Sequence, residues 1–376
     1  MLGTCIFKDI YLETPEFLKY SLHTCAIISA PISFLGFYII LFKTPDLMKS
    51  AKSYILNVHL SIVLFDFCIG FLATPFLLFP AMAGFPLGLF QYFGVPIIFQ
   101  TIIAFFFLGF ASFAIMSLFE SRFFIICEFP GKKYWKFWRH IWFYGHYIFH
   151  SLAMFSLYFT VPEQETAVRN LKESLPCLPD RIKSGPIFVL NDEIGFHVFI
   201  MISTIFIVTI EVCLLFYFLV TDISKKLKNS NLSQKTVQAQ KLFLTALFLQ
   251  IAVPLTTIVV PLIYIFSSII VNYYNQTFTN FAMIMGSTHG FMSSIVMIMV
   301  HRPYREAFMA MIGKTKKIVL PVVSMKTTSV YEIPCLPESF KSAPIFVLAD
   351  EIGFQVVLMI TATAIFIKEF SLLHTS

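Results

Sequence analysis

Long apolar runs alternate with short polar segments along most of this chain. Seven runs are long enough to cross a bilayer as helices, and they lie at about 21–42, 54–80, 94–119, 139–162, 194–220, 242–270 and 278–300. A hydrocarbon layer of about 30 Å needs roughly 20 apolar residues, because an α-helix rises about 1.5 Å per residue. The pattern therefore predicts an all-α membrane protein, a seven-transmembrane helix bundle within residues 21–308.

Four prolines lie more than one helical turn from the ends of these runs, at Pro31, Pro75, Pro254 and Pro261. Proline lacks a backbone donor and clashes with the preceding helical turn, which breaks or bends the hydrogen-bond ladder. A bundle tolerates such breaks where neighbouring helices satisfy the freed carbonyls. We therefore expect kinks in the second and sixth helices.

The composition agrees with a protein surrounded by lipid, since 57% of residues are hydrophobic, 13% are charged and 46 are Phe. The net charge of +6 does not indicate a nucleic-acid partner, because the Lys and Arg residues are dispersed among apolar runs and form no continuous basic face. The seven Cys residues say little about redox compartment, since thiols in membrane helices often behave as small apolar groups. No secretory signal is predicted, because the first twenty residues mix five charges without an apolar core.

The loops between the runs differ sharply in charge. The first, third and fifth loops are basic, through Lys43, Lys49 and Lys52, then Arg122, Lys132, Lys133, Lys136 and Arg139, then Lys225, Lys226, Lys228, Lys235 and Lys241. The second and sixth loops hold no Lys or Arg, and the fourth loop, 163–193, balances four bases with six acids. Lys and Arg stay preferentially on the cytoplasmic side of a membrane. Residues 1–20 are therefore expected to be extracellular, and the tail, 309–376, to be cytoplasmic.

The tail contains a partial copy of an earlier segment. Residues 334–362 repeat residues 176–204 at a constant offset of 158, so that PIFVL occurs in both places. A single local copy is unlike the regular periods of repeat architectures, which favours an exon duplication or a gene-model artefact. The alternative is a real eighth segment at Ile352–Ile367, although about 16 apolar residues are short for spanning a membrane.

Several short motifs together resemble the nematode serpentine chemoreceptors of class H over most of residues 15–308. They are PEFLKYSLH at 15–23, KTP at 43–45, PAMAGFPLG at 80–88, LFESR at 118–122, VPEQET at 161–166, PCLP at 176–179, NYYNQ at 272–276, and HG followed by VMIMVHRPYREA at 296–307. The resemblance implies a G-protein-coupled receptor that detects an external small molecule. It further implies a heterotrimeric G protein as partner and the plasma membrane of sensory-neuron cilia as location.

The chain departs from the family pattern at a few positions. Ser121 stands where the family usually has Asn, Phe123 where it has Tyr, and NVHLS at 57–61 where it has NLHFW. None of these departures removes a charge. The tail repeat is the larger departure, and it leaves a non-functional receptor paralogue as an alternative.

The resemblance implies a G-protein switch at the cytoplasmic end of the third helix, formed by Glu120 and Arg122. An acid beside an Arg can hold a resting state that opening breaks. The alternative is that both residues merely end the helix and reach toward lipid headgroups. The segment after the seventh helix joins this coupling region with Arg302, Pro303, Tyr304 and Arg305. Its proline favours a break followed by a short interfacial helix, although a basic stop-transfer signal looks similar.

Three polar residues are expected inside the membrane: Asp66, Glu211 and His289. A carboxylate in lipid is costly, so Asp66 should face the bundle interior, a cation or a hydrogen-bond partner. It resembles the helix-two Asp of other seven-helix receptors, which coordinates sodium, and the alternative is a neutral, hydrogen-bonded Asp. Glu211 is expected to meet a ligand or a polar residue on the sixth helix, or else to serve in helix packing.

His146 and His150 stand one turn apart in the fourth helix, but no third ligand lies beside them. Histidines inside membranes commonly hydrogen-bond to other helices, so no metal is predicted. Cys5 and Cys177 lie in segments expected outside, where they can form a disulfide or remain free thiols.

The Phe-rich runs, such as Phe105–Phe107, are expected to serve in packing or lipid contact, although a volatile or apolar ligand can exploit them. A ligand pocket would lie in the outer half, between helices three, five, six and seven. The chain shows no Walker lysine loop, nucleophile elbow, dinucleotide glycines or HExxH motif, so neither an enzyme nor a cofactor is predicted. The alternative to a receptor is a transporter or ligand-gated channel lined by the intramembrane acids and histidines, yet the sequence shows no symmetric halves.

Overall fold

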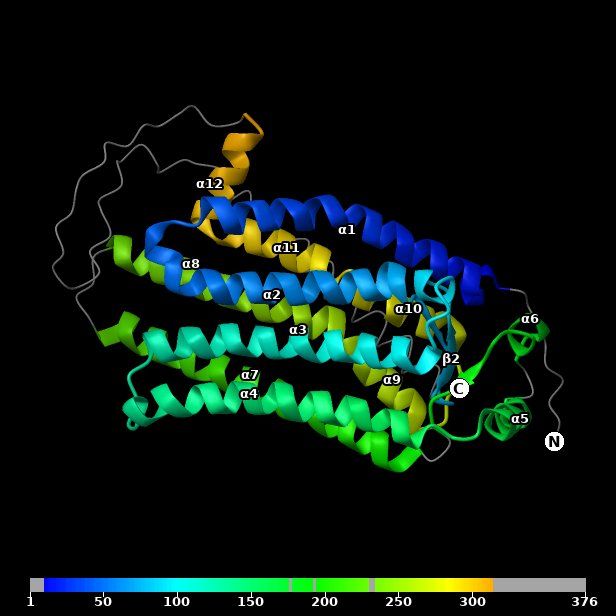
Figure 1. The fold of residues 1–376 in the computed structure, drawn as a ribbon. Coiled ribbons are helices and arrows are strands. Elements are labelled where there is room, and N and C mark those ends of the chain that lie inside the picture. The colour runs from blue at the N-terminus through cyan, green and yellow to red at the C-terminus, as the bar shows by residue number, and fades with distance from the viewer. Residues whose placement is uncertain (1–9, 176–177, 192–193, 230–233, 314–376) are drawn as a thin grey trace, which may run out of the picture.

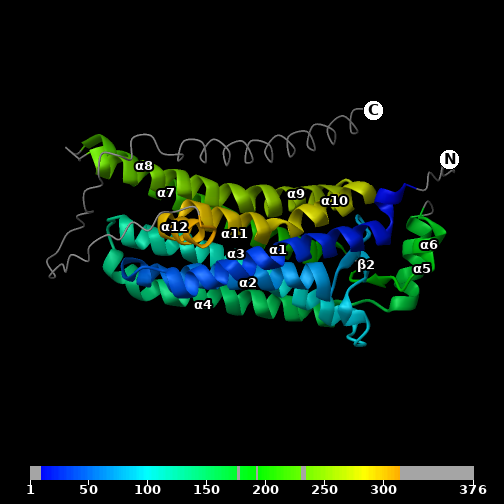
Figure 2. The ribbon, with the colours of Figure 1, turned by 90° about the horizontal axis from the view of Figure 1, so that it is seen from above.

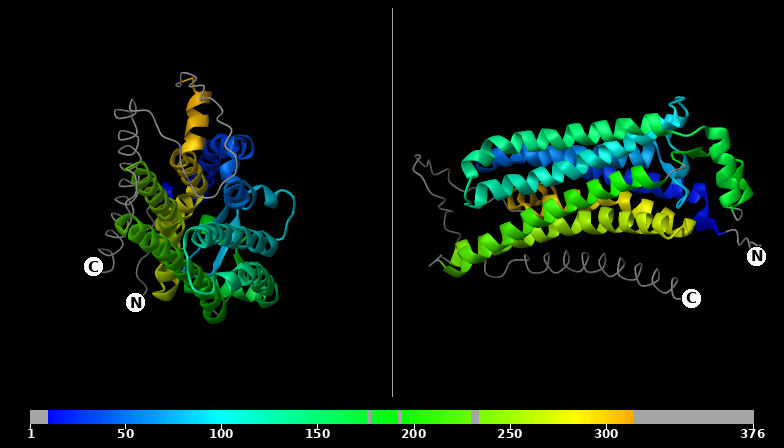
Figure 3. Two further views of the ribbon diagram at one scale, coloured as in Figure 1. Left: turned by 90° about the vertical axis from the view of Figure 1, so that its left-hand side faces the viewer. Right: turned by 90° about the horizontal axis from the view of Figure 1, so that it is seen from below.

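The computed structural model describes residues 10–175, 178–191, 194–229 and 234–313. Long helices lie side by side in one elongated bundle, as Figure 1 and both views of Figure 3 show. The bundle helices are α1 (Pro15–Lys43), α2 (Lys49–Phe67), α3 (Ile97–Ile126), α4 (Lys132–Ser156), α7 (Ile194–Asn229), α8 (Gln234–Pro254), α9 (Val260–Ile270), α10 (Gln276–Ser287) and α11 (His289–Val300).

Shorter elements join and cover these helices. The short helices are α5 (Gln164–Ser174), α6 (Asp180–Lys183) and α12 (Arg302–Met311), and the strands are β1 (Pro75–Leu77), β2 (Ala83–Pro86) and β3 (Phe188–Val189). Single turns of 3-10 helix lie at Tyr11–Glu13, Asp46–Met48, Leu89–Gln91 and Leu157–Thr160, and turns of π-helix at Cys68–Leu72 and Leu255–Val259.

The prediction of a seven-helix membrane bundle is confirmed. Six helical segments of the described chain are long and apolar enough to cross a membrane: Pro15–Lys43, Ala51–Leu72, Ile97–Ile126, Phe199–Lys228, Gln240–Ile270 and Gln276–Val300. The remaining bundle helix is α4, which has 25 residues and packs against α3. It is less apolar than the other six because its first three turns carry four bases, at Lys132, Lys133, Lys136 and Arg139.

The two ends of the bundle differ in character. One end, which we call the basic end, holds the last residues of α1, α3 and α7 and the first residues of α2, α4 and α8. The other end, which we call the lid end, holds the three-stranded sheet together with α5 and α6 (Figures 1 and 2). Helix α12, drawn in orange in Figure 1, leaves the basic end beside α1.

The second helix ends earlier than its apolar run predicts, which corrects both its boundary and the kink expected at Pro75. The π turn closes at Leu72, Thr74 adopts a positive φ of 42°, and Pro75 opens β1. A residue before proline is disfavoured in the α conformation, so the helix stops ahead of Pro75.

The strands form an antiparallel sheet in the order β1-β2-β3. Phe76 lies opposite Phe85, and Gly84 lies opposite Phe188 in the next pair. A Cβ at Gly84 would overlap the carbonyl oxygen of Phe76, so only glycine permits this approach. The sheet thus ties the segment after α2 to the long connection between α4 and α7.

The Gln164 side chain pairs with the backbone of β3 on the edge of the sheet. The Gln164 amide donates to the carbonyl of Val189 and accepts from its backbone N–H, each at 3.0 Å. This fixes both ends of the connection that carries α5 and α6. Ala167, Leu171 and Ile182 from this connection are buried against Leu18 and Phe76.

Several bases expected in loops lie on helices. Helix α3 continues to Ile126, and α4 begins after Gly131, whose φ of +86° is left-handed. Helix α7 continues to Asn229, about two turns beyond its predicted end. Arg122 and Arg139 therefore lie on helices α3 and α4 and not in the loop between them.

The later helices are interrupted within the membrane. A π turn, Leu255–Val259, separates α8 from α9 between Pro254 and Pro261, which agrees with the break expected there. The seventh helix divides at Thr288 into α10 and α11, which its apolar run does not indicate. Pro31 lies inside the continuous helix α1.

Candidate functional site

A buried acid at the basic end of α3 is held by α4. The Glu120 side chain is completely buried, and Arg139 pairs with one of its carboxylate oxygens. The indole N–H of Trp135 donates to the other oxygen at 2.7 Å. Arg139 also donates to the Tyr54 hydroxyl on α2 at 3.3 Å. Glu120 thus joins three helices through charge-assisted hydrogen bonds.

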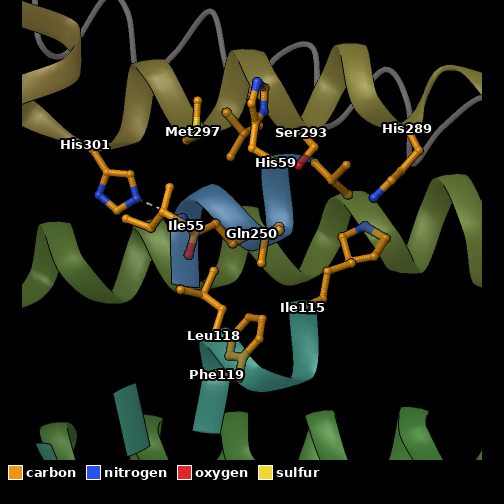
Figure 4. Close-up of a pocket in the computed structure, with 14 residues that line it drawn as sticks. Ile55, His59, Ile115, Leu118, Phe119, Gln250, His289, Ser293, Met297 and His301 are labelled. Carbon is orange, nitrogen blue, oxygen red and sulfur yellow. Dashed lines mark hydrogen bonds between the residues drawn. The ribbon is translucent and has the colours of Figure 1, made fainter. Parts of the chain in front are cut away.

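Arg122 pairs with a different helix from Glu120. Its Nη1 donates to the Gln250 side-chain oxygen on α8 at 2.6 Å, and its guanidinium lies 5.5 Å from the centre of the Phe243 ring. The Gln250 amide nitrogen lies 3.2 Å from His301 Nε2, as Figure 4 shows. The predicted switch residues therefore do not pair with each other, and Arg122 joins α3 to α8 and to the end of α11.

The His301 ring is neutral in this arrangement. An amide N–H can donate only to an unprotonated ring nitrogen, so Gln250 requires the neutral form. Burial, and to a smaller degree the charge of Arg122, lowers the pKa of His301 to about 3.

A cavity of about 50 Å³ adjoins this chain of hydrogen bonds (Figure 4). It is lined by side chains of α2, α3, α8 and α11 and by His301, which follows α11. The lining residues are Ile55, Val58, His59, Ile115, Leu118, Phe119, Gln250, Val253, Pro254, His289, Ser293, Val296, Met297 and His301. The space is sufficient for a few water molecules, because one water needs roughly 10–15 Å³ measured in this way. The basic half of the bundle is thus not fully packed between α3 and α8, which leaves room for these helices to shift.

The segment after the seventh helix forms the short helix that its proline predicts, α12, with Pro303 in its first turn. Tyr304 is fully buried, and its hydroxyl lies 3.0 Å from Thr44 Oγ1 at the end of α1. Arg305 donates to the carbonyl of Met299 at 2.8 Å, and Arg302 pairs with Glu306 at 2.7 Å on the exposed side. Tyr304 therefore anchors α12 to the bundle, whereas Arg302 remains accessible.

Asp66 faces the bundle interior, as its cost in lipid predicts. It is 7% exposed, and neither carboxylate oxygen has a hydrogen-bond partner among the described residues. A Cβ at Gly290 would overlap Asp66 Oδ2, so α2 and α11 approach closely here. The residue before Gly290, His289, is 1% exposed and pairs through Nδ1 with Thr257 Oγ1 at 2.8 Å, inside the π turn of the sixth helix.

Glu211 pairs with a residue of α4. Its carboxylate lies 3.3 Å from His146 Nε2 on α4, and not on the sixth helix. His146 also pairs with the Trp142 carbonyl at 2.9 Å, and His150 with that of Phe105 at 3.1 Å. The Glu211–His146 pair therefore joins α4 to α7. The rotation of each helix about its axis decides which residues meet, and this rotation cannot be read from the sequence.

Sequence reasoning missed the partners that hold the switch residues. Gln250 is a single amide in an apolar run, and Arg139 is one of several bases around the third loop. A polar residue within an apolar helix is a signal that could have identified Gln250. Trp135 and Tyr54 offer no comparable signal, because amphipathic aromatic residues are common near membrane surfaces.

The outer half of the bundle contains an apolar cluster where a pocket was predicted. Its buried members are Met82, Leu190, Tyr264, Ile265, Ile269 and Ala282, with Phe79, Ile98, Phe105, Phe188, Ile202, Phe266 and Phe278 packed around them. The cluster brings together α3, α7, α9 and α10 beneath the sheet. Cys5 and Cys177, the predicted disulfide pair, lie outside the described residues.

Comparisons with known proteins identify the family that this chain resembles. Residues 13–314 match the family described as "Serpentine type 7TM GPCR chemoreceptor Srh". The chain is 23% identical over 331 residues to "Serpentine receptor class H-72" of Caenorhabditis elegans, covering 86% of this chain and 93% of that protein. Among solved structures, it is similar to the crystal structure of squid rhodopsin, with a TM-score of 0.49 and 12% identity over 82% of this chain and 87% of that one.

Proposed function

We propose, because the chain belongs to the class H family of serpentine seven-transmembrane chemoreceptors, that it detects an external small molecule and activates a heterotrimeric G protein. In this proposal the lid end faces the outside and the basic end faces the cytoplasm, in accordance with the excess of Lys and Arg at the basic end. The expected location is the plasma membrane of sensory-neuron cilia.

The hydrogen bond between Arg122 and Gln250 carries the proposal. It joins α3 to α8 beside a cavity, at the end where a cytoplasmic partner would bind. A bond between two helices that can separate is a two-state element, and a ligand acts on it by favouring one state. The resting state is the one in which Arg122 is bound to Gln250, and separation of α8 from α3 frees Arg122 for the G protein.

The outer apolar cluster supports the ligand class. Tyr264 and Ile265 on α9 are buried among aromatic and aliphatic side chains, which suits a small apolar or volatile molecule. Helix α9 continues through the π turn into α8, where Gln250 lies. His289 and Thr257 pair at this turn, so a ligand that shifts α9 would change the position of α8 through one connected path. Asp66, against Gly290, would keep α2 in register with the same path.

The proposal is tested by G-protein nucleotide exchange in membranes from cells that express the receptor. Gln250→Leu removes the acceptor of Arg122 and should raise ligand-independent exchange by about threefold or more, which corresponds to roughly 0.7 kcal/mol of lost resting-state bias. Arg122→Ala should reduce exchange to the level of membranes without receptor.

A matched control is Arg169→Ala, which removes an exposed Arg from α5 at the lid end and should leave basal exchange unchanged. Surface protein is measured for every variant. Unchanged exchange in both Gln250→Leu and Arg122→Ala at equal surface amounts would overturn the proposed switch.

A further inference from the structure

An aromatic groove lies on the outer surface of α4 at the basic end. It has a volume of about 570 Å³ and is lined by Phe129, Pro130, Gly131, Tyr134, Trp135, Trp138, Ile141 and Trp142. The three Trp residues are the only ones in the chain. Their spacing of three and four residues places them along one face of the helix.

Part of this groove is fixed in place. Trp135 is tied to the buried carboxylate of Glu120, and its ring lies 5.7 Å from that of Trp142. Trp142 is held in turn against Phe143, with ring centres 5.0 Å apart. These rings form a preorganised floor, which lowers the entropic cost of binding.

Three other groove residues are exposed. Trp138 is 56% exposed, Tyr134 is 74% exposed and Ile141 is 47% exposed. Among the described residues, neither the Trp138 indole nor the Tyr134 hydroxyl has a hydrogen-bond partner. Both are amphipathic groups of the kind that lie where acyl chains meet headgroups.

The charges beside the groove are unbalanced. Lys132 pairs with Glu128 at 2.8 Å, and Arg139 pairs with Glu120, so these two bases are neutralised. Lys133 and Lys136 are exposed in the first turns of α4, adjacent in sequence to Tyr134 and Trp135. Neither has an acidic partner within the described part of the chain.

We propose that this groove binds an acidic phospholipid. The acyl chains lie on Trp138, Ile141 and Trp142, and Lys133 and Lys136 bind the headgroup. Basic residues at the membrane surface attract acidic lipids, and the fixed aromatic floor adds a defined place for the chains.

The chain offers a direct probe, because its Trp fluorescence comes only from this region. Purified protein is placed in phosphatidylcholine vesicles that contain about 10 mol% of a lipid with brominated acyl chains, which quench Trp on contact. Brominated phosphatidylserine should quench the emission about twofold more than brominated phosphatidylcholine at the same fraction.

Two double variants locate the effect. Lys133→Ala with Lys136→Ala should abolish the excess quenching, whereas Lys43→Ala with Lys241→Ala removes two exposed lysines from the same end and should leave it unchanged. Equal quenching by the two lipids in the parent protein would overturn the proposal. So would excess quenching that survives the Lys133 and Lys136 substitutions, or stronger quenching by a brominated sterol than by either phospholipid.

Discussion

Glu120 carries a charge that cannot reach water, and residues of another helix, α4, stabilise this buried charge. Arg139 neutralises the carboxylate, and Trp135 satisfies its second oxygen. Removing one partner of a buried ion pair leaves the other charge uncompensated, which costs more than the pair itself contributes.

Arg139→Met should therefore lower the free energy of unfolding by about 3–5 kcal/mol, as measured by denaturation of the purified protein in detergent. Adding Glu120→Gln should recover part of this loss, because the buried charge is then gone. Arg169→Met on the exposed face of α5 should change stability by less than about 0.5 kcal/mol. A loss in the double variant equal to the sum of the single losses would contradict the pairing.

The lowered pKa of His301 leads us to expect that the free energy of unfolding falls in acid. Its pKa of about 3 in the folded protein lies below the usual value near 6.5, so the unfolded state binds a proton that the folded state does not. Stability from this group is present above about pH 6.5 and falls by up to roughly 1.4 kcal/mol per unit as the pH drops toward 3.

Unfolding measured from pH 7.5 to 5 in parent and His301→Gln protein isolates this contribution. The parent should lose more stability than the variant over this range. His140→Gln removes an exposed histidine from α4 and should follow the parent. Identical pH profiles for the parent and His301→Gln would show that the ring does not titrate with unfolding.

At the scale of single residues, the sequence singles out candidate side chains but does not predict which residues they contact. Arg122 is marked by the LFESR motif and Asp66 by its cost in lipid. Their partners depend on helix rotation and on exact helix ends. Helix α4 begins at Lys132, seven residues before its predicted start, so Arg139 lies within the helix and pairs with the buried Glu120.

At the scale of elements, α3 and α4 approach closely through a glycine. A Cβ at Gly109 would overlap the ring of His150, which is 6% exposed, bonded to the Phe105 carbonyl and packed edge-on against Phe113. The ring has no room to withdraw, so the two helices would have to separate.

Gly109→Ala should therefore destabilise the protein by about 1–3 kcal/mol, in the range of overpacked cores. Gly145→Ala is a matched substitution on α4 with no neighbouring atom within 4 Å of its Cβ. It should stabilise by roughly 0.5–1 kcal/mol through helix propensity alone. Thermal unfolding of both variants tests the contact, and a stabilising Gly109→Ala would contradict it.

Helix number was predictable and helix ends were not. Apolar length sets the number, because each span must cross the same hydrocarbon thickness. The ends depend on local signals that an apolar run conceals, such as Thr14 capping α1 or Thr74 adopting a positive φ before Pro75. The strands are too short for their alternation to be recognised, and β3 comes from a segment that is distant in the sequence.

At the scale of the whole molecule, one side chain, Gln164, joins the two ends of the connection that forms the lid. Val189 is 5% exposed, and its backbone N–H and carbonyl both pair with Gln164. Gln164→Ala should leave these groups unpaired, at a cost of about 1–3 kcal/mol each, and loosen the lid without unfolding the bundle. Hydrogen exchange at residues 187–190 should accelerate, whereas Glu165→Ala on the exposed side should not change it.

The orientation of the molecule follows from its charged ends and is tested by protease protection in intact cells. A tag before Met1 should be digested and a tag after Ser376 should be protected. Two digested tags would place both termini outside and make the eighth segment a span.

The Gln164 anchor also bears on the duplicated sequence. The first copy contributes β3, yet the residues that hold this strand, on β2 and at Gln164, precede the copied region. The position equivalent to Gln164 before the second copy is Val322, which has no amide to offer. The second copy thus repeats the sequence of β3, but the residues before it do not repeat the partners that hold β3 in the first copy.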